Sequence, residues 1–324
     1  MKKIALTLAT FALVFVSINL FTTCKKKDGV YKPKEKISKI YYEVVRYDSA
    51  GKVDTAGAMK KELKEIWRWD KKKLMQIESY DRSWSWDFVY KGDQVTKIES
   101  GDMTVNFTYK DKSDLEKIEV LDDQERTLLI VTVKDRSDRK ITKLSYAIYT
   151  YEKSLKSGTL LSDRLEPVMH IMLGNNVGET VLSNMASNEK MHKANTIVNV
   201  SADLTYSGNN VTKAQWTTEN NPIPLVYTYT YDNKVNPYYR AIALMFSGDV
   251  YGITTQAFFN LFPCSENNMI GYEEVQDTNR TSIKYVYEYD SKDFPVKQTK
   301  VYEYIHSVYG KYTYNYIYHY EYVD

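Results

Sequence analysis

The chain has 324 residues, with 44 Lys and Arg against 42 Asp and Glu, and it holds 30 tyrosines but only 13 glycines and 7 prolines. This length allows one large β domain or two smaller ones, and the aromatic content excludes a largely disordered protein. The near-zero charge balance argues against a nucleic-acid-binding surface, which needs a clustered excess of Lys and Arg.

The N-terminus has the pattern of an export signal. A basic start (1–3) precedes an apolar run (4–20), and the sequence FTTC then ends at Cys24, directly before a run of lysines. Such an order is typical of a secretory signal. The cysteine at the cut resembles the lipobox of bacterial lipoproteins, in particular the looser boxes of the Bacteroidota, in which this residue is acylated and becomes the first of the mature protein. The resemblance predicts removal of the signal peptide at 1–24 and lipidation of Cys24; the alternative is an ordinary signal peptide that contains a cysteine.

The next residues, 25–37, are predicted to form a flexible basic tether, because their lysines are typical of a solvated segment. Removing residues 1–24 takes away two lysines and no acid, so the remaining basic and acidic side chains are equal in number. We expect one repeat-built β domain over 38–324. The lipid would hold it at the outer membrane of the cell envelope, facing the periplasm or the surface, and no nucleic-acid partner is expected.

Two triplets follow the first predicted strand (38–47). Asp48-Ser49-Ala50 and Asp54-Thr55-Ala56 both resemble the acceptor of Bacteroidota O-glycosylation. A loop tip can carry a bulky sugar without disturbing the core. The resemblance therefore predicts modification of Ser49 and Thr55.

A short pattern returns along the chain, as in FVYKGDQVTKI (88–98). An alternating stretch ends in an aromatic residue, a polar turn follows, and an aliphatic–polar–Lys–aliphatic stretch comes next. Copies begin at Trp67, Phe88, Phe107, Val131 and Leu204, with weaker ones at Tyr229 and Tyr287. Period-2 alternation predicts strands, turn residues predict hairpins, and the copies are too close together for crossover helices. The fold class is therefore all-β: a long antiparallel meander, strongly curled or closed into a barrel-like shape, since flat open sheets twist and expose edges.

Two insertions interrupt this pattern. The stretch 155–195 contains residue types that bind soft metals: Met169, Met172, Met185, Met191, His170 and His192. Their spacing forms no ligand set, so a loop or short helix whose methionines fill a core gap is favoured. The more apolar stretch 240–262 predicts a short helix that caps or plugs the β structure.

Two family resemblances appear at the hairpins. The aromatic–aspartate turns at 69–70, 231–232 and 289–290 resemble the tyrosine–aspartate repeats of Rhs and teneurin shells. The segments YTYDNKVNPYY (229–239), SENNMIGYEEV (265–275) and YVYEYDSKDFPVKQTKVYEY (285–304) resemble the carboxy-terminal signature of a Bacteroidota lipoprotein family of unknown function. That family is described as porin-like, so the resemblance implies a meandering β-barrel in the cell envelope and supplies no catalytic residues.

The last strand carries a row of alternating tyrosines: Tyr312, Tyr314, Tyr316, Tyr318, Tyr320 and Tyr322. On a strand they share one face. This face either packs across strands over a thin core or forms an aromatic surface that binds sugar rings or peptide.

The sequence contains no recognisable catalytic or metal-binding motif, and we predict no catalytic residue, metal or cofactor. Cys264, which has no disulfide partner if Cys24 is lipidated, is interpreted as a small buried hydrophobe. His306 and His319 are expected to be cross-strand neighbours. The function predicted is that of a lipid-anchored, non-enzymatic envelope protein that binds a glycan or protein ligand. The alternatives are a carbohydrate-active hydrolase and a membrane-inserted porin-like barrel.

Overall fold

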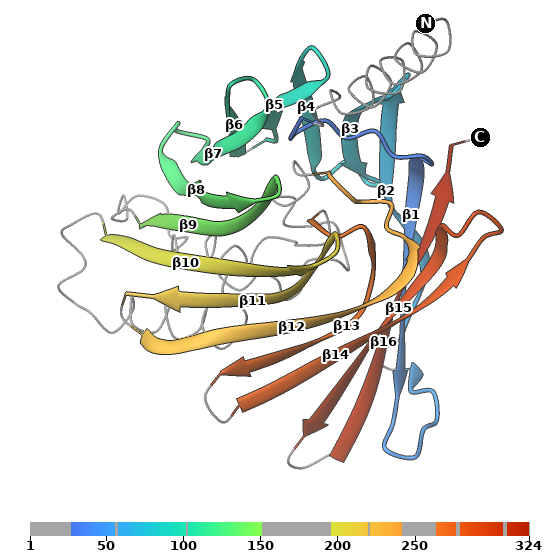
Figure 1. Ribbon diagram of the computed structural model, residues 1–324. Coiled ribbons are helices and arrows are strands. Elements are labelled where there is room, and N and C mark those ends of the chain that lie inside the picture. Colours follow the sequence, from blue (N-terminus) through green and yellow to red (C-terminus); the bar gives the residue numbers. More distant parts are fainter. Residues whose placement is uncertain are drawn as a thin grey trace, which may run out of the picture.

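The computed structural model describes residues 27–55, 58–101, 103–150, 196–219, 221–241, 264–276, 279–306 and 310–323, and these form an all-β structure (Figure 1). The strands are β1 (Ile37–Tyr47), β2 (Met59–Asp70), β3 (Lys73–Ser79), β4 (Ser85–Lys91), β5 (Gln94–Glu99), β6 (Met103–Lys110), β7 (Asp114–Asp122), β8 (Thr127–Ser137), β9 (Lys140–Thr150), β10 (Thr196–Ser207), β11 (Asn210–Thr218), β12 (Asn221–Val235), β13 (Asn267–Gln276), β14 (Asn279–Tyr289), β15 (Pro295–His306) and β16 (Gly310–Tyr322).

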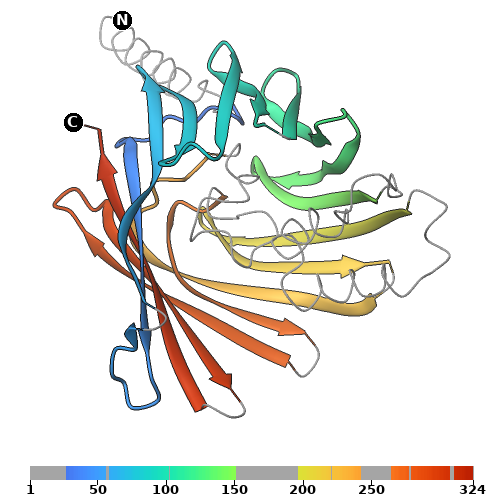
Figure 2. The ribbon, with the colours of Figure 1, turned by 180° about the vertical axis from the view of Figure 1, so that it is seen from behind.

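The sheet is one closed barrel in which every strand pairs antiparallel with its neighbours in sequence, and β16 pairs with β1 (Figures 1 and 2). The closing pair runs from Ile37 opposite Tyr322 to Tyr47 opposite Thr313. The predicted fold class, a long antiparallel meander closed into a barrel, is confirmed. The insertion at 155–195 and most of that at 240–262 lie outside the described residues, so their helical content stays a prediction.

The two ends of the barrel have different connections. At one end, called the turn end here, each even strand passes into the next odd one, and most of these connections are tight. Gly92 (φ 63°), Asp138 (φ 48°) and Arg139 (φ 68°) occupy the left-handed region in these turns. Two-residue hairpins need such angles because their twist then matches that of the strands. The opposite end carries the connections from odd to even strands.

A β-bulge at the start of each odd strand explains the aliphatic–x–x–aliphatic pattern. In the hairpin of β4 and β5, Val89 pairs with Lys97 and Tyr90 pairs with Val95, so Thr96 is left over. The extra residue turns Val95 and Ile98, three positions apart, to the same face, and both are 1% exposed. The same register shift leaves over Ser38, Met75, Glu116, Thr142, Thr212, Ile270 and Val296.

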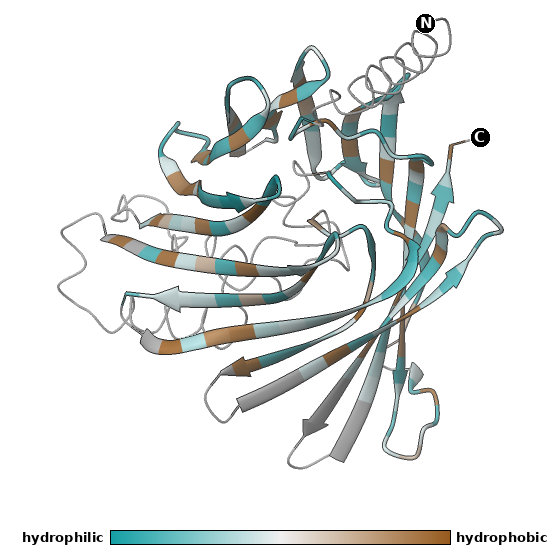
Figure 3. Ribbon diagram, in the orientation of Figure 1, coloured by the Kyte–Doolittle hydropathy of each residue, from teal (hydrophilic) through white to brown (hydrophobic). Residues whose placement is uncertain are grey.

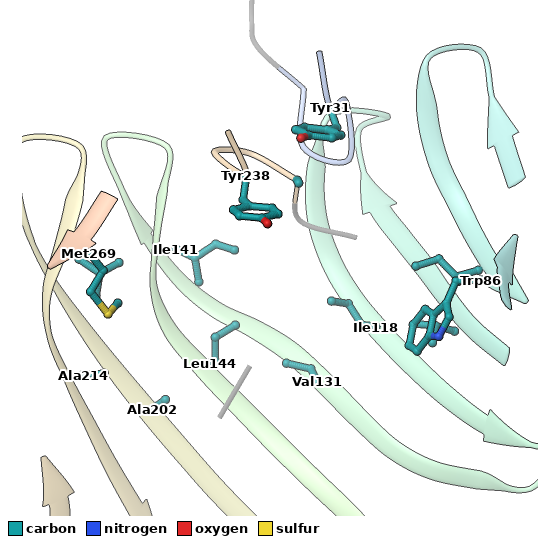
Figure 4. Close-up of a cluster of buried hydrophobic side chains, with 14 of the residues drawn as sticks. Tyr31, Trp86, Ile118, Val131, Ile141, Leu144, Ala202, Ala214, Tyr238 and Met269 are labelled. Atoms are coloured by element: carbon teal, nitrogen blue, oxygen red, sulfur yellow. The ribbon is translucent and has the colours of Figure 1, made fainter. Parts of the chain in front are cut away.

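The buried face of the sheet is the inner one, as the neighbours of Tyr238 show. Tyr238 follows β12, yet its ring lies 6.1 Å from that of Trp67 on β2 and 6.4 Å from that of Tyr320 on β16. Neither strand adjoins β12, so these contacts cross the barrel mouth. Apolar and polar residues alternate along the strands (Figure 3), and the apolar ones form one core cluster, part of which Figure 4 shows beneath Tyr31 and Tyr238.

The aromatic anchors of the repeat hold neighbouring hairpins together at the turn end. The Tyr90 hydroxyl on β4 donates to the Leu74 carbonyl at the start of β3, at 2.7 Å. The Tyr109 hydroxyl on β6 donates in the same way to Val95 on β5, at 2.6 Å. Equivalent bonds to the preceding odd strand are Trp69 to Ile37, Tyr231 to Val211, Tyr287 to Met269 and Tyr322 to Pro295.

Residues 27–36, called the strap here, lie across the turn end and correct the expectation of a free tether. The Asp28 amide donates to the Ser113 carbonyl at 2.8 Å, and the Gly29 carbonyl accepts from the Val95 amide at 3.0 Å. Tyr31 is 7% exposed, and its hydroxyl donates to the Pro237 carbonyl at 2.6 Å. Its basic composition suggested solvation, but one buried aromatic and several backbone bonds fix the strap to the barrel.

Candidate anion-binding cleft at the turn end

The tyrosine row of β16 faces the core. Tyr318 and Tyr320 are 4% and 6% exposed, while Tyr314, Tyr316 and Tyr322 are partly buried against the same cluster. Burial raises the pKa of the Tyr318 and Tyr320 phenols above their ordinary value. The side chain of Tyr312 lies outside the described set. The described tyrosines of this row therefore pack against the core cluster.

The phenol tips of this region find polar partners inside the barrel. The Tyr320 hydroxyl donates to Gln298 Oε1 at 2.9 Å, and Gln298 Nε2 donates to the Tyr287 hydroxyl at 2.8 Å. Tyr287 in turn donates to the Met269 carbonyl at 2.9 Å. These three hydrogen bonds span β16, β15, β14 and β13. They give partners to polar groups that burial removes from water.

The two C-terminal histidines are not cross-strand neighbours, so that expectation is wrong. His306 pairs with Gly310 beside the hairpin turn, whereas His319 pairs with Lys297 toward the other end of the strand. The error arises because both strands are long and one histidine sits at the turn itself. His319 Nε2 lies 3.1 Å from Glu43 Oε2 instead. No cluster of possible metal ligands occurs among the described residues.

The remaining predicted residues divide between the surface and the core. Ser49 and Thr55 are exposed on the β1–β2 connection, where Asp48 Oδ1 accepts from the Ala50 and Lys52 amides at 2.9 Å each. Cys264 packs against the core cluster, and burial raises the pKa of its thiol to about 12, so it is protonated at neutral pH. Cys24, His170 and His192 lie outside the described residues.

A cleft of about 590 Å³ opens between the strap and the connection that follows β12. Its lining comes from the strap, from residues 233–240, from the start of β13 and from the β14–β15 turn: Lys27, Val30, Lys32, Pro33, Lys34, Asn233, Lys234, Val235, Asn236, Pro237, Tyr239, Arg240, Glu266, Asn267 and Phe294. The two principal walls are far apart in sequence, as the bond between Tyr31 and Pro237 shows with its separation of 206 positions.

Asparagine side chains fix the second wall. Asn236 Nδ2 donates to the Ser265 carbonyl at 2.8 Å, and Asn236 Oδ1 accepts from the Tyr238 amide at 2.9 Å. Asn267 Nδ2 donates to the Lys234 carbonyl at 3.0 Å, and Asn268 Nδ2 donates to the Val235 carbonyl at 3.1 Å. Because Asn amides imitate backbone partners, they hold the irregular end of β12 and the residues that follow it.

The cleft is strongly basic. Five of its lining residues are cations, Lys27, Lys32, Lys34, Lys234 and Arg240, against the single carboxylate of Glu266. Two cations have acidic partners just outside the lining, since Lys32 lies 2.6 Å from Asp93 and Lys234 lies 2.6 Å from Asp293.

The cleft stays positive when both ion pairs are included, because its five cations outnumber the carboxylates of Glu266, Asp93 and Asp293. The carboxylate partners, Asp93 and Asp293, are 56% and 54% exposed, and exposed ion pairs contribute little stability. The Lys32 ammonium nevertheless lowers the pKa of the Asp93 carboxyl through a hydrogen bond. Arg240 holds a left-handed backbone (φ 69°) and its Nη2 donates to the Lys27 carbonyl at 3.4 Å, which joins the two walls.

This arrangement suits an anion. Ammonium and guanidinium groups with nearby amides can form charge-assisted hydrogen bonds to phosphate or carboxylate oxygens. Both walls lie in segments that stand out in the sequence, the basic residues 25–37 and the segment YTYDNKVNPYY (229–239), but nothing in the sequence indicates that the two meet.

Comparison with known proteins gives no family. No protein-family model and no curated protein matches the chain. Among solved structures, it is similar to a porin-like protein from Bacteroides uniformis at 12% identity and a TM-score of 0.35, over 89% of this chain and 98% of that one. It is also similar to a crystal structure of TcdB2-TccC3-TEV at 12% identity and a TM-score of 0.30, over 82% of this chain but only 13% of that one. We draw no function from either likeness.

Proposed function

We propose that the protein is a non-enzymatic, lipid-anchored barrel of the bacterial cell envelope that binds a small anionic ligand in the turn-end cleft. The observation that carries this proposal is the excess of cationic side chains around one cleft of about 590 Å³, which is large enough for a small molecule. The anchoring part rests on the export pattern ending at Cys24. A sugar acid, a phosphate ester or an acidic group of a protein partner would each offer the chemistry that the cleft recognises. Modification at Ser49 and Thr55 is a further part of the proposal, supported by their exposure on one connection.

The outer face of the barrel supports this proposal over a membrane-inserted one. A lipid-facing barrel needs an apolar outer band about 25 Å tall. Here ion pairs occupy the outside of several strands: Lys97–Glu99, Lys117–Glu119, Lys143–Asp203 and Lys297–Glu288. Charged side chains in such places favour water. Among the described residues, no helix is long and apolar enough to cross a membrane.

Calorimetric titration tests the binding proposal. The chain from residue 25 onward would be titrated with glycerol 3-phosphate and with glucuronate, and glycerol and glucose serve as uncharged controls. We expect an anion to bind, and we expect the double variant Lys34→Gln/Arg240→Gln to weaken binding. A matched double variant at the opposite end, Lys52→Gln/Lys60→Gln, should leave the affinity unchanged. Equal, weak heats for all four compounds would refute the cleft as a ligand site.

A further inference from the structure

The strap limits how far the barrel can move from a lipid at Cys24. Asp28 is fixed by three contacts: its backbone amide bonds to Ser113, and its carboxylate accepts from the Leu115 amide at 2.8 Å and pairs with Arg136 at 2.7 Å. Four peptide steps separate residues 24 and 28, and they span at most about 14 Å. An anchor at Cys24 therefore keeps the turn end close to the bilayer.

The opposite end of the barrel cannot lie close to the bilayer when Cys24 is anchored. Strands β12 and β16 have 15 and 13 residues. At about 3.3 Å per residue, strands of this length hold the opposite end roughly 40 Å away, or somewhat less when tilted. This distance exceeds the span of residues 24–28. An anchor at Cys24 therefore determines which end of the barrel faces the membrane.

The charge distribution agrees with this orientation. Among the described residues around the turn end, exposed lysines and arginines outnumber exposed carboxylates. These cations include Lys27, Lys34, Lys71, Lys72, Lys112, Arg139 and Lys292. Among the described residues around the opposite end the balance is reversed: exposed Asp81, Glu99, Asp123, Glu125, Glu219 and Glu62 outnumber exposed Lys52, Lys60, Lys61 and Arg82. A basic surface is attracted to anionic lipid headgroups, and an acidic one is repelled.

We propose that the turn end docks on the bilayer and that the cleft between the strap and residues 233–240 receives the phosphate of an anionic glycerophospholipid headgroup. The inference rests on the proposed function, since it names the source of the anion bound in the same cleft. Lys34 and Arg240 line the cleft from opposite walls, so a headgroup that contacted both would bridge the strap to the barrel. Binding the headgroup would therefore also stabilise the docked strap.

Vesicle co-sedimentation tests the inference without the lipid anchor. The chain from residue 25 onward, which holds the strap and every strand, would be mixed with vesicles of phosphatidylcholine alone or with added phosphatidylglycerol. We expect binding only to the anionic vesicles. Lys34→Gln/Arg240→Gln should weaken it about 30-fold, or about 2 kcal/mol at 1.4 kcal/mol per tenfold, because each cation near an anionic surface contributes about half of that. The Lys52→Gln/Lys60→Gln variant should bind like the wild type, and unchanged circular dichroism melting confirms that both variants fold.

The outcomes separate the two proposals. Equal losses in both double variants would show diffuse attraction and overturn the headgroup site. Binding of glycerol 3-phosphate in solution without binding to anionic vesicles would overturn membrane docking and leave the ligand-binding proposal intact. No binding to either probe would overturn both.

Discussion

Replacing Gly29 by alanine tests whether the strap is built on one close contact. Gly29 has φ +71°, and a Cβ placed there would lie 2.0 Å from the Tyr109 hydroxyl oxygen and 2.7 Å from its Cζ. Tyr109 cannot simply move away, because its hydroxyl donates to the Val95 carbonyl while the Val95 amide donates to Gly29. The left-handed backbone costs alanine about 1–2 kcal/mol. Losing one hydrogen bond adds about 1 kcal/mol, so we expect a total of about 2–3 kcal/mol.

The expected result is release of the strap from a barrel that stays folded. Hydrogen exchange should quicken at the Val95 amide, protease should cut within residues 27–36, and anion affinity should fall because one wall of the cleft is lost. Gly92→Ala is the matched control, since Gly92 has φ +63° but no atom within 4 Å of a built Cβ. In chemical denaturation, Gly92→Ala should lose only the cost of the left-handed backbone, about 1–2 kcal/mol of unfolding free energy. Equal effects of both substitutions, or unchanged exchange at Val95, would refute the reasoning.

Three further predictions concern the core. Tyr90→Phe should cost about 1 kcal/mol of unfolding free energy because it removes the bond to Leu74, whereas Tyr80→Phe, at a residue 64% exposed, should cost nothing measurable by denaturation. Burial lowers the pKa of Lys300 to about 8 from 10.5, so between these values the unfolded state binds more protons and stability should rise with pH; Lys300→Met should abolish that rise. Burial raises the pKa of Tyr318 and other inward tyrosines, so their contribution to the unfolding free energy is complete below about pH 10. Above that pH the unfolding free energy should fall by up to about 1.4 kcal/mol per pH unit for each such tyrosine. Denaturation followed by tyrosinate absorbance checks this slope, and constant stability above pH 10 would contradict it.

The sequence was sufficient for the meander because its signals are local. The FVYKGDQVTKI stretch contains both strands of one hairpin and its turn, and the structure pairs Tyr90 with Val95 as the pattern requires. The bulge was not predicted, although its mark was visible. Val95 and Ile98 would face opposite sides of a regular strand, so an aliphatic pair at this spacing in every copy indicates an extra residue.

The candidate site could not be predicted, because it depends on contacts between distant segments. The strap looks like a tether by composition, and Tyr31 is its single aromatic residue. Only the arrangement of the closed barrel shows that this ring reaches Trp69, at 5.8 Å, and Pro237. The tyrosine row of β16 illustrates the same limit, since alternation shows that its members share a face but does not show whether that face is covered.

One irregular copy of the repeat supplies an additional contact to the strap. In β8 the anchor position is Val133, which has no hydroxyl to donate to the preceding odd strand. Arg136 supplies the missing donor, because its Nη2 bonds to the Leu115 carbonyl at the start of β7, at 2.8 Å. The same nitrogen lies 2.7 Å from the Asp28 carboxylate. A guanidinium can serve both partners, whereas a tyrosine hydroxyl at this position would have satisfied only the barrel. The copy that departs from the aromatic pattern therefore adds an ion pair to the backbone bonds that already hold the strap, and through the strap it helps to set one wall of the cleft.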